Sequence, residues 1–146
     1  MPSLYRYSHA FTTTLQRPGN QPRYRHCGDE SSFGIGPGLL ESAYQACLRQ
    51  ELLNAGFYCE VQLGLPVVYR GEKLDLGYRI DLLVQNLVIV EIKSVEAISP
   101  VHRAQIISYL KLSGKSLGLL INFNVVHLKD GLRRFVSGTQ WMRVGA

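Results

Sequence analysis

The sequence predicts an α/β domain in which helices flank a mixed central β-sheet. The first observation is an apolar stripe with helical spacing over residues 39–53. The second is a pair of strand-like segments, 78–84 and 87–93, that meet at Gln85-Asn86. The third is another helical segment, 100–113, followed by a further apolar strand. Helices interspersed with strands in this order favour a layered architecture.

The first half of the domain is predicted from the positions of proline and glycine and from the spacing of its apolar residues. Pro37 suits the first turn of the helix at 39–53, and Gly56 suits its end. Strands are expected next at 57–65 and 67–69. The strand at 87–93 is β-branched and nearly continuous in apolar residues, which is typical of a buried central strand.

The second half begins with a helix and ends with strands. Pro100 opens the helix and Gly114 ends it. Residues 117–123 are then expected to form another buried strand, because they are apolar throughout most of their length. Two edge strands, 125–128 and 132–136, are expected to complete the sheet.

Composition excludes several classes of protein. The chain has 146 residues, of which 46% are hydrophobic, so it suits one domain with a real core. Its longest clean apolar run, Leu87-Val88-Ile89-Val90, is far shorter than the roughly 18 residues that span a bilayer. No membrane partner and no secretory signal are therefore expected. The three cysteines, Cys27, Cys47 and Cys59, contain no CxxC pair, which favours a reducing, cytoplasmic location.

The N-terminal segment differs from the rest of the chain in its charge and in its lack of an apolar pattern. The chain carries a net charge of +5, which favours a polyanionic partner. Residues 1–33 contain four arginines, no acid before Asp29 and no apolar periodicity. We expect an atypical, disordered arm at 1–33 and the domain at 34–146. An organellar transit peptide, or a misplaced start upstream of the domain, are the alternatives.

Charged residues interrupt the two strands that are expected to be most deeply buried. Glu91 and Lys93 lie at i and i+2, so they project from one face of the strand. Burying two such charges costs several kcal/mol per ion unless they are paired or bind something. Asp81 interrupts the neighbouring strand, and the antiparallel turn can bring it close to Glu91. Such carboxylates suit a hard divalent cation. The alternative is a buried Lys93–Glu91 ion pair with Asp81 capping a turn.

Two helices carry further polar candidates. His102, Gln105 and Tyr109 share one face of the helix at 100–113, where a glutamine can hold a water or a phosphate oxygen. Glu41 and Tyr44 share one side of the first helix. The alternatives are a solvated polar stripe on the later helix and, for Glu41, an ordinary first-turn acid favoured by the helix dipole.

Taken together, these residues resemble a known family. Asp81 followed by Glu91-Ile92-Lys93 resembles the Asp…Glu-x-Lys signature of the PD-(D/E)XK nuclease superfamily. Gln105-Ile106-Ile107-Ser108-Tyr109 is similar to the Gln-x-x-x-Tyr helix of its exonuclease-like branches. Gly38-Leu39-Leu40-Glu41-Ser42-Ala43-Tyr44 matches the motif that names the GxxExxY family. The resemblance covers about residues 34–137 and implies a restriction-endonuclease-like fold. The helix that usually precedes the Gly-Pro-Gly turn in such proteins has no counterpart in residues 1–33.

The resemblance also implies an activity, the hydrolysis of nucleic-acid phosphodiesters, with DNA as the expected substrate. It implies that Mg²⁺ or Mn²⁺ is held by Asp81, Glu91 and the Ile92 carbonyl, with Glu41 completing the site directly or through water. Lys93 is expected to orient the attacking water. The substrate would be positioned by Gln105 and Tyr109, with His102 at the margin, and flanking phosphates would be held by Lys111, Lys115, Arg133 and Arg134.

Two other functions compete with a nuclease. One is a catalytically inactive nuclease fold that works by binding a nucleic acid or a protein. The other is a structural domain in which the charges form a buried network. Retention of all three signature residues, Asp81, Glu91 and Lys93, argues against an inactive site.

Overall fold

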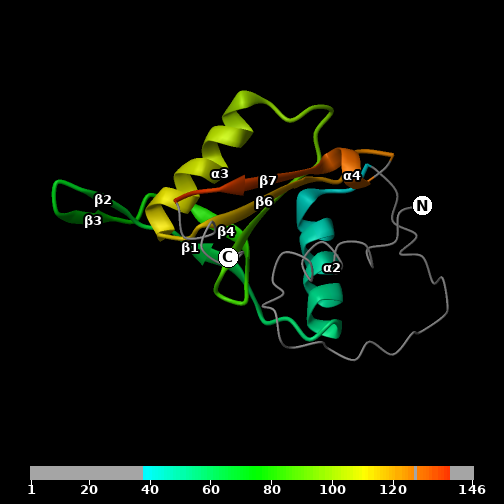
Figure 1. Cartoon of the computed structure of the whole chain (residues 1–146), viewed down its shortest axis with the longest axis horizontal. Helices are drawn as coiled ribbons and strands as arrows, with labels where there is room; N and C mark the ends of the chain where they lie inside the picture. The colour runs from blue at the N-terminus through cyan, green and yellow to red at the C-terminus, as the bar shows by residue number, and fades with distance from the viewer. Residues whose placement is uncertain (1–37, 127, 139–146) are drawn as a thin grey trace, which may run out of the picture.

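The computed structural model describes residues 38–126 and 128–138 (Figure 1). The arm predicted at 1–33, the boundary at residue 34 and Pro37 lie outside these residues. The described elements, in chain order, are α2 (Glu41–Asn54), β1 (Cys59–Gly64), β2 (Val67–Tyr69), β3 (Glu72–Leu74), β4 (Arg79–Val84), β5 (Val88–Lys93), α3 (Pro100–Ser113), β6 (Leu117–Asn122), α4 (Leu128–Gly131) and β7 (Leu132–Val136).

A five-stranded mixed sheet of order β1-β4-β5-β6-β7 forms the centre of the molecule. The β4–β5 pair is antiparallel and turns at Gln85 and Asn86, whose φ angles of 53° and 54° are typical of a tight hairpin turn. β5 and β6 run parallel, so they require the crossover that α3 provides. The predicted α/β class and the mixed sheet are therefore confirmed.

The two long helices cover opposite faces of the sheet (Figure 1). Along β5, Val88, Val90 and Ile92 pack in the core on the α2 side. Ile89 packs in the core on the α3 side. Because side chains alternate along a strand, Glu91 also faces the α3 side. Glu91 is almost fully buried there, at 2% exposure.

The first helix starts two residues later than the sequence predicts. Leu40 has an extended backbone and serves as the N-cap, and its side chain is 77% exposed. The Leu39 amide donates to the Tyr44 hydroxyl at 3.3 Å, and the Leu39 carbonyl accepts from Ser94 Oγ at 2.9 Å. The first bond ties the segment before the helix to α2 itself, and the second ties it to the loop after β5. Leu39 and Leu40 therefore do not belong to the buried stripe of α2.

Helix α3 has the predicted bounds, and the sequence around it explains both ends. Ser99 caps its start, and Gly114 at its end adopts the left-handed conformation with φ 69°. The helix also packs closely on β6, since a Cβ atom on Gly118 would lie 2.8 Å from Ile106 Cδ1. Glycine at this position allows α3 to lie directly against the sheet.

One predicted strand was wrong, and one strand was missed. Residues 123–126 form no strand, and Leu128–Gly131 form the short helix α4 instead of the predicted edge strand at 125–128. The cause is local: the Asn122 side chain accepts from the Asn124 amide, and Gly131 packs against the Asn122 carbonyl. The second error is an omission, because Glu72–Leu74 pairs with β2 in a separate two-stranded sheet.

Candidate active site

The β4–β5 ladder ends early, and two carboxylates lie just beyond its end. The last backbone pair is Leu82–Val90. In the next step the Ile92 amide donates to Asp81 Oδ2 at 2.9 Å, and the Asp81 amide donates to Glu91 Oε1 at 3.3 Å. Each carboxylate thus accepts a hydrogen bond from a backbone amide of the opposite strand. This exchange holds Asp81 and Glu91 together at the point where the strands separate.

The Ile92 carbonyl faces the same gap. The N–H and C=O groups of one strand residue point to the same neighbouring strand, and successive residues alternate. The Lys93 carbonyl accepts from the Phe123 amide, which follows β6. Ile92 therefore directs its amide and its carbonyl toward β4, where Asp81 lies. Two carboxylates and one carbonyl oxygen meet on this side of β5.

Gln62 orients Asp81 and was missed by the sequence analysis. Its amide donates to Asp81 Oδ1 at 3.2 Å and to Gln45 Oε1 on α2 at 2.6 Å. Gln62 lies opposite Asp81 in β1 and has a φ of 50°, which costs free energy in a residue other than glycine. In the sequence it reads as an ordinary solvent-facing strand residue, so nothing there marks its role.

The electrostatics of the pair are unfavourable without a cation. Burial and, second to it, the neighbouring charge of Asp81 raise the pKa of the Glu91 carboxyl to about 8, although the hydrogen bond from the Asp81 amide and the Lys93 ammonium oppose the shift. A divalent cation relieves such repulsion, and Mg²⁺ prefers one or two carboxylates plus water. The donor set of Asp81, Glu91 and the Ile92 carbonyl therefore fits a hard divalent metal.

Glu41 approaches the same end of β5 without joining the pair. Its carboxylate accepts from the Ser94 amide at 3.4 Å, one residue after Lys93. Within residues 38–126 and 128–138, no three His, Cys, Asp or Glu side chains form a group that could hold a metal ion. The convergence of Glu41 with Asp81 and Glu91 around one ion stays a prediction.

The α3 candidates divide into two groups. The Gln105 amide donates to the Tyr109 hydroxyl at 3.0 Å. Burial raises the pKa of Tyr109, the hydrogen bond from Gln105 lowers it, and the charges of Glu91 and Asp81 add to the increase. Tyr109 packs in the core on the α3 side of the sheet, the side that Glu91 also faces. His102 has a different contact: its Nδ1 accepts from the Ser99 amide at 3.1 Å, completing a capping box. His102 thus stabilises the start of α3.

The remaining predicted residues have structural contacts or solvent around them. Tyr44 is buried and stacks on Phe123 with ring centroids 4.5 Å apart. Lys115 donates to Asn86 at 2.9 Å, at the turn end of the hairpin and away from Asp81. Arg133 donates to the carbonyls of Asp130 and Leu132. The exposed side chains in this predicted phosphate-binding set are Lys111, Arg133 and Arg134.

Comparison with known proteins places the chain in a family. A family model described as the PD-(D/E)XK nuclease superfamily matches residues 31–135. The chain belongs to this superfamily. No curated protein and no solved structure gives a significant match. PD-(D/E)XK nucleases generally depend on divalent metals, and the observed sheet with its two flanking helices is consistent with their restriction-endonuclease-like fold.

No helix in the described part of the chain combines the length and the apolar character needed to cross a bilayer.

Proposed function

We propose that this protein is a nuclease of the GxxExxY type that hydrolyses DNA phosphodiester bonds with Mg²⁺ or Mn²⁺. The observation that carries the proposal is the exchange of hydrogen bonds between Asp81 and Glu91 where β4 and β5 separate. A purely structural strand pair would continue its backbone ladder at this point. Here two carboxylates replace it, at an electrostatic cost that a bound cation offsets.

The metal would be held by Asp81, Glu91 and the Ile92 carbonyl, with Glu41 reached through water. When bound, it supplies Lewis-acid polarisation of the phosphate and lowers the pKa of a coordinated water. Burial of Glu91 keeps bulk water away from its side of the site, which strengthens every charge interaction there.

The other residues position the substrate and the nucleophile. Lys93 projects from β5 on the same face as Glu91, so its ammonium can orient a water and neutralise charge on the phosphate. Tyr109 packs on the α3 side of the sheet, which Glu91 also faces, and its hydroxyl accepts from Gln105 one helical turn earlier. We assign this pair to the positioning of the scissile group. The two described cysteines, Cys47 and Cys59, are free thiols, which suits action in the cytoplasm.

Cleavage of labelled single- and double-stranded DNA and RNA, with Mg²⁺, Mn²⁺ or EDTA, tests the proposal. We expect metal-dependent cleavage of DNA that is lost in Asp81→Asn, Glu91→Gln and Lys93→Ala. Glu51→Gln is the matched control, because this acid lies ten residues, or about 15 Å, along α2 from Glu41. Cleavage that survives in Asp81→Asn would contradict the assignment.

An inactive nuclease fold that binds a nucleic acid or a protein is the second candidate. The observation that favours it is that Glu41 does not complete a three-acid group with Asp81 and Glu91. A thermal shift with Mn²⁺ separates the two candidates. A working site should gain stability with Mn²⁺ in wild type and in Lys93→Ala, but not in Asp81→Asn. A wild-type melting temperature that stays unmoved at millimolar Mn²⁺ would favour the binding module.

A further inference from the structure

The β2–β3 hairpin extends from the body of the molecule as an arm. Figure 1 shows it projecting past the sheet, with no helix covering it. It continues the β1–β4 pair, since the last ladder pair is Gly64–Arg79 and the Leu65 amide then donates to the Tyr78 carbonyl at 2.8 Å. Every residue from 68 to 79 is exposed. We call residues 67–79 the arm; it is distinct from the N-terminal segment expected at 1–33.

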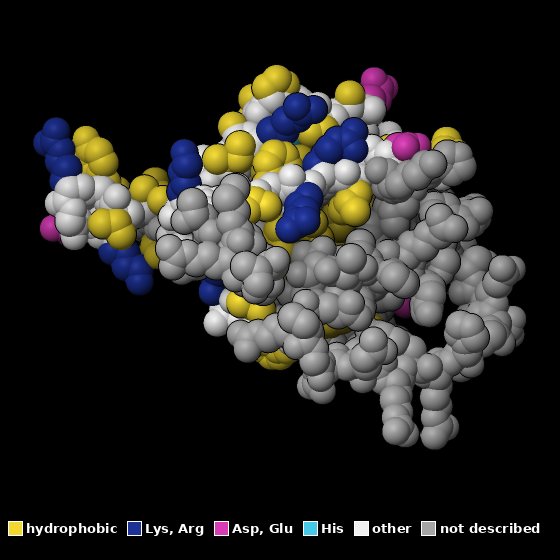
Figure 2. Space-filling model, viewed as in Figure 1, with side chains coloured by type: hydrophobic (Ala, Val, Ile, Leu, Met, Phe, Trp, Pro, Cys, Tyr) yellow, Lys and Arg dark blue, Asp and Glu magenta, His cyan; other side chains and the backbone are white. Residues whose placement is uncertain are grey.

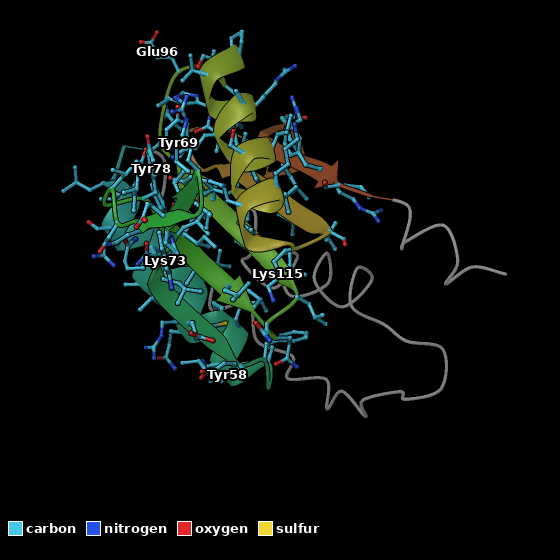
Figure 3. The ribbon with its side chains drawn as sticks, turned by 90° about the vertical axis from the view of Figure 1, so that its left-hand side faces the viewer. Tyr58, Tyr69, Lys73, Tyr78, Glu96 and Lys115 are labelled. Carbon is cyan, nitrogen blue, oxygen red and sulfur yellow. The ribbon has the colours of Figure 1, made fainter. Side chains whose placement is uncertain are left out.

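Aromatic and cationic side chains gather on this arm. Tyr69 is 59% exposed and Tyr78 is 46% exposed. The Arg70 guanidinium lies over the Tyr69 ring, 5.4 Å from its centroid, so one face of that ring carries a cation. Figure 2 shows Lys and Arg side chains beside hydrophobic ones on the projecting segment. Figure 3 labels Tyr69, Lys73 and Tyr78 on the side of the molecule that faces the viewer.

Tyr78 connects the arm to the carboxylate pair. Its ring tilts against the Tyr109 ring at a centroid distance of 6.3 Å. Tyr109 in turn packs in the core on the α3 side of the sheet, the side that Glu91 also faces. Tyr78 also precedes Asp81 by three strand residues, or about 10 Å. A linear polymer that is bound at the candidate site and extends along β4 therefore reaches Tyr78 first and the β2–β3 hairpin afterwards.

We propose that the arm binds the single-stranded flank of a nucleic-acid substrate by stacking unpaired bases on Tyr78 and Tyr69. The identity of the ligand rests on the proposed function, whereas the binding itself needs no cleavage. Exposed tyrosine rings next to cations are the features that bind single strands with little sequence preference. The bases of an intact duplex offer no free faces to these rings, so single strands are preferred.

Charge on the arm sets how strongly salt should weaken binding. Arg70, Lys73 and Arg79 are opposed by Glu72 and Asp75, which leaves the arm at +1. The Asp75 carboxylate accepts from the Gly77 amide and so holds the turn. With at most three phosphate contacts, log affinity should fall with log salt at a slope of about −2 or shallower.

The test measures anisotropy of a labelled single-stranded oligonucleotide in EDTA, where no metal-dependent cleavage occurs. Tyr69→Ala should weaken binding by roughly tenfold, whereas Tyr69→Phe should bind like wild type because it keeps the ring. Tyr58→Ala is the matched control, since Tyr58 is also 59% exposed but lies before β1, beside the β4–β5 turn. Lys73→Ala should weaken binding and make its salt dependence shallower, because it removes one of the three cations of the arm.

The outcomes separate this proposal from the nuclease assignment. If binding depends on Tyr69 but the protein cleaves no substrate, the proposal for the arm is supported and the nuclease assignment is contradicted. If Tyr69→Ala changes neither cleavage nor binding, the proposal for the arm is contradicted and the nuclease assignment is unaffected. The arm is also overturned if wild type binds no single strand, if it prefers a duplex, or if Tyr69→Ala changes only the oligomeric state, which would make the hairpin a self-association surface.

Discussion

At the scale of the residue, Glu91 is the group whose protonation couples the site to stability. Its pKa of about 8 in the folded protein exceeds the ordinary value of 4.5. Between these values the folded state binds more protons than the unfolded state. The free energy of unfolding therefore falls as pH rises through this window, by at most about 1.4 kcal/mol per pH unit.

The first prediction follows from this sign. Urea denaturation of the metal-free protein from about pH 5 to about pH 9 should give a declining stability in wild type and no such decline in Glu91→Gln. At pH 8 the variant should be the more stable of the two, as is common when a functional charge is removed. A decline that persists in Glu91→Gln would assign the titration to another group.

Gln62 provides the second prediction. At this position one substitution can remove the hydrogen bond to Asp81 and at the same time relieve the backbone strain, so the effects on metal binding and on stability can be told apart. Gln62→Gly removes the amide that holds Asp81 and also relieves the positive φ. We expect the dissociation constant for Mn²⁺, measured by calorimetry, to rise about tenfold, while stability stays within about 1 kcal/mol of wild type. Gln50→Ala is the control, since its amide bonds Asn54 on an exposed face. Unchanged metal affinity would show that Asp81 needs no such support.

At the scale of the element, the ends of α3 and the central hairpin could be read from the sequence. Pro100 and Gly114 are strong local signals, and α3 has the predicted bounds. The apolar run of β5 likewise identifies the central strand. These elements were predictable because each depends on neighbours within one or two turns of the chain.

The parts of the fold and of the site that were not predicted depend on contacts between residues far apart in the sequence. Residues 125–128 look like a strand, but Asn122 and Gly131 close a compact turn there. Gln62 matters only because β1 pairs with β4, and Glu41 only because the start of α2 meets Ser94. The pairing of Asp81 with Glu91 was predictable from the hairpin register, whereas the support around it was not.

The capping box of α3 gives the third prediction. Ser99→Ala and His102→Ala should each lower stability by about 1 kcal/mol, and the double variant should lose less than the sum, because both side chains serve one reciprocal cap. Cleavage of DNA should be retained in His102→Ala. Loss of cleavage at unchanged stability would instead move His102 into the active site.

At the scale of the whole molecule, the site draws on both layers of the fold. Gln45 on α2 reaches Asp81 through Gln62, while Tyr109 approaches from α3 on the other face. The carboxylate pair thus lies where the two helix layers meet the separating strands. A variant that loosens either helix should weaken metal binding even when it touches no ligand.

The division of the chain gives the fourth prediction. The family model begins at residue 31, close to the proposed boundary at 34. Limited proteolysis should cut at Arg17, Arg23 or Arg25 and leave a stable core that begins near Gly34. Mass spectrometry identifies the fragments. A segment 1–33 that resists cleavage under these conditions would contradict the domain boundary.

The contacts of the site also differ greatly in sequence separation, and this has a kinetic consequence. The bonds between Asp81 and the Glu91-Ile92 segment join residues 10 and 11 positions apart, whereas those from Ser94 to Glu41 and Leu39 span 53 and 55 positions. Closing the longer loop costs more entropy, so local pairings form first. During refolding the carboxylate pair should assemble within the β4–β5 hairpin, and α2 should dock on it last.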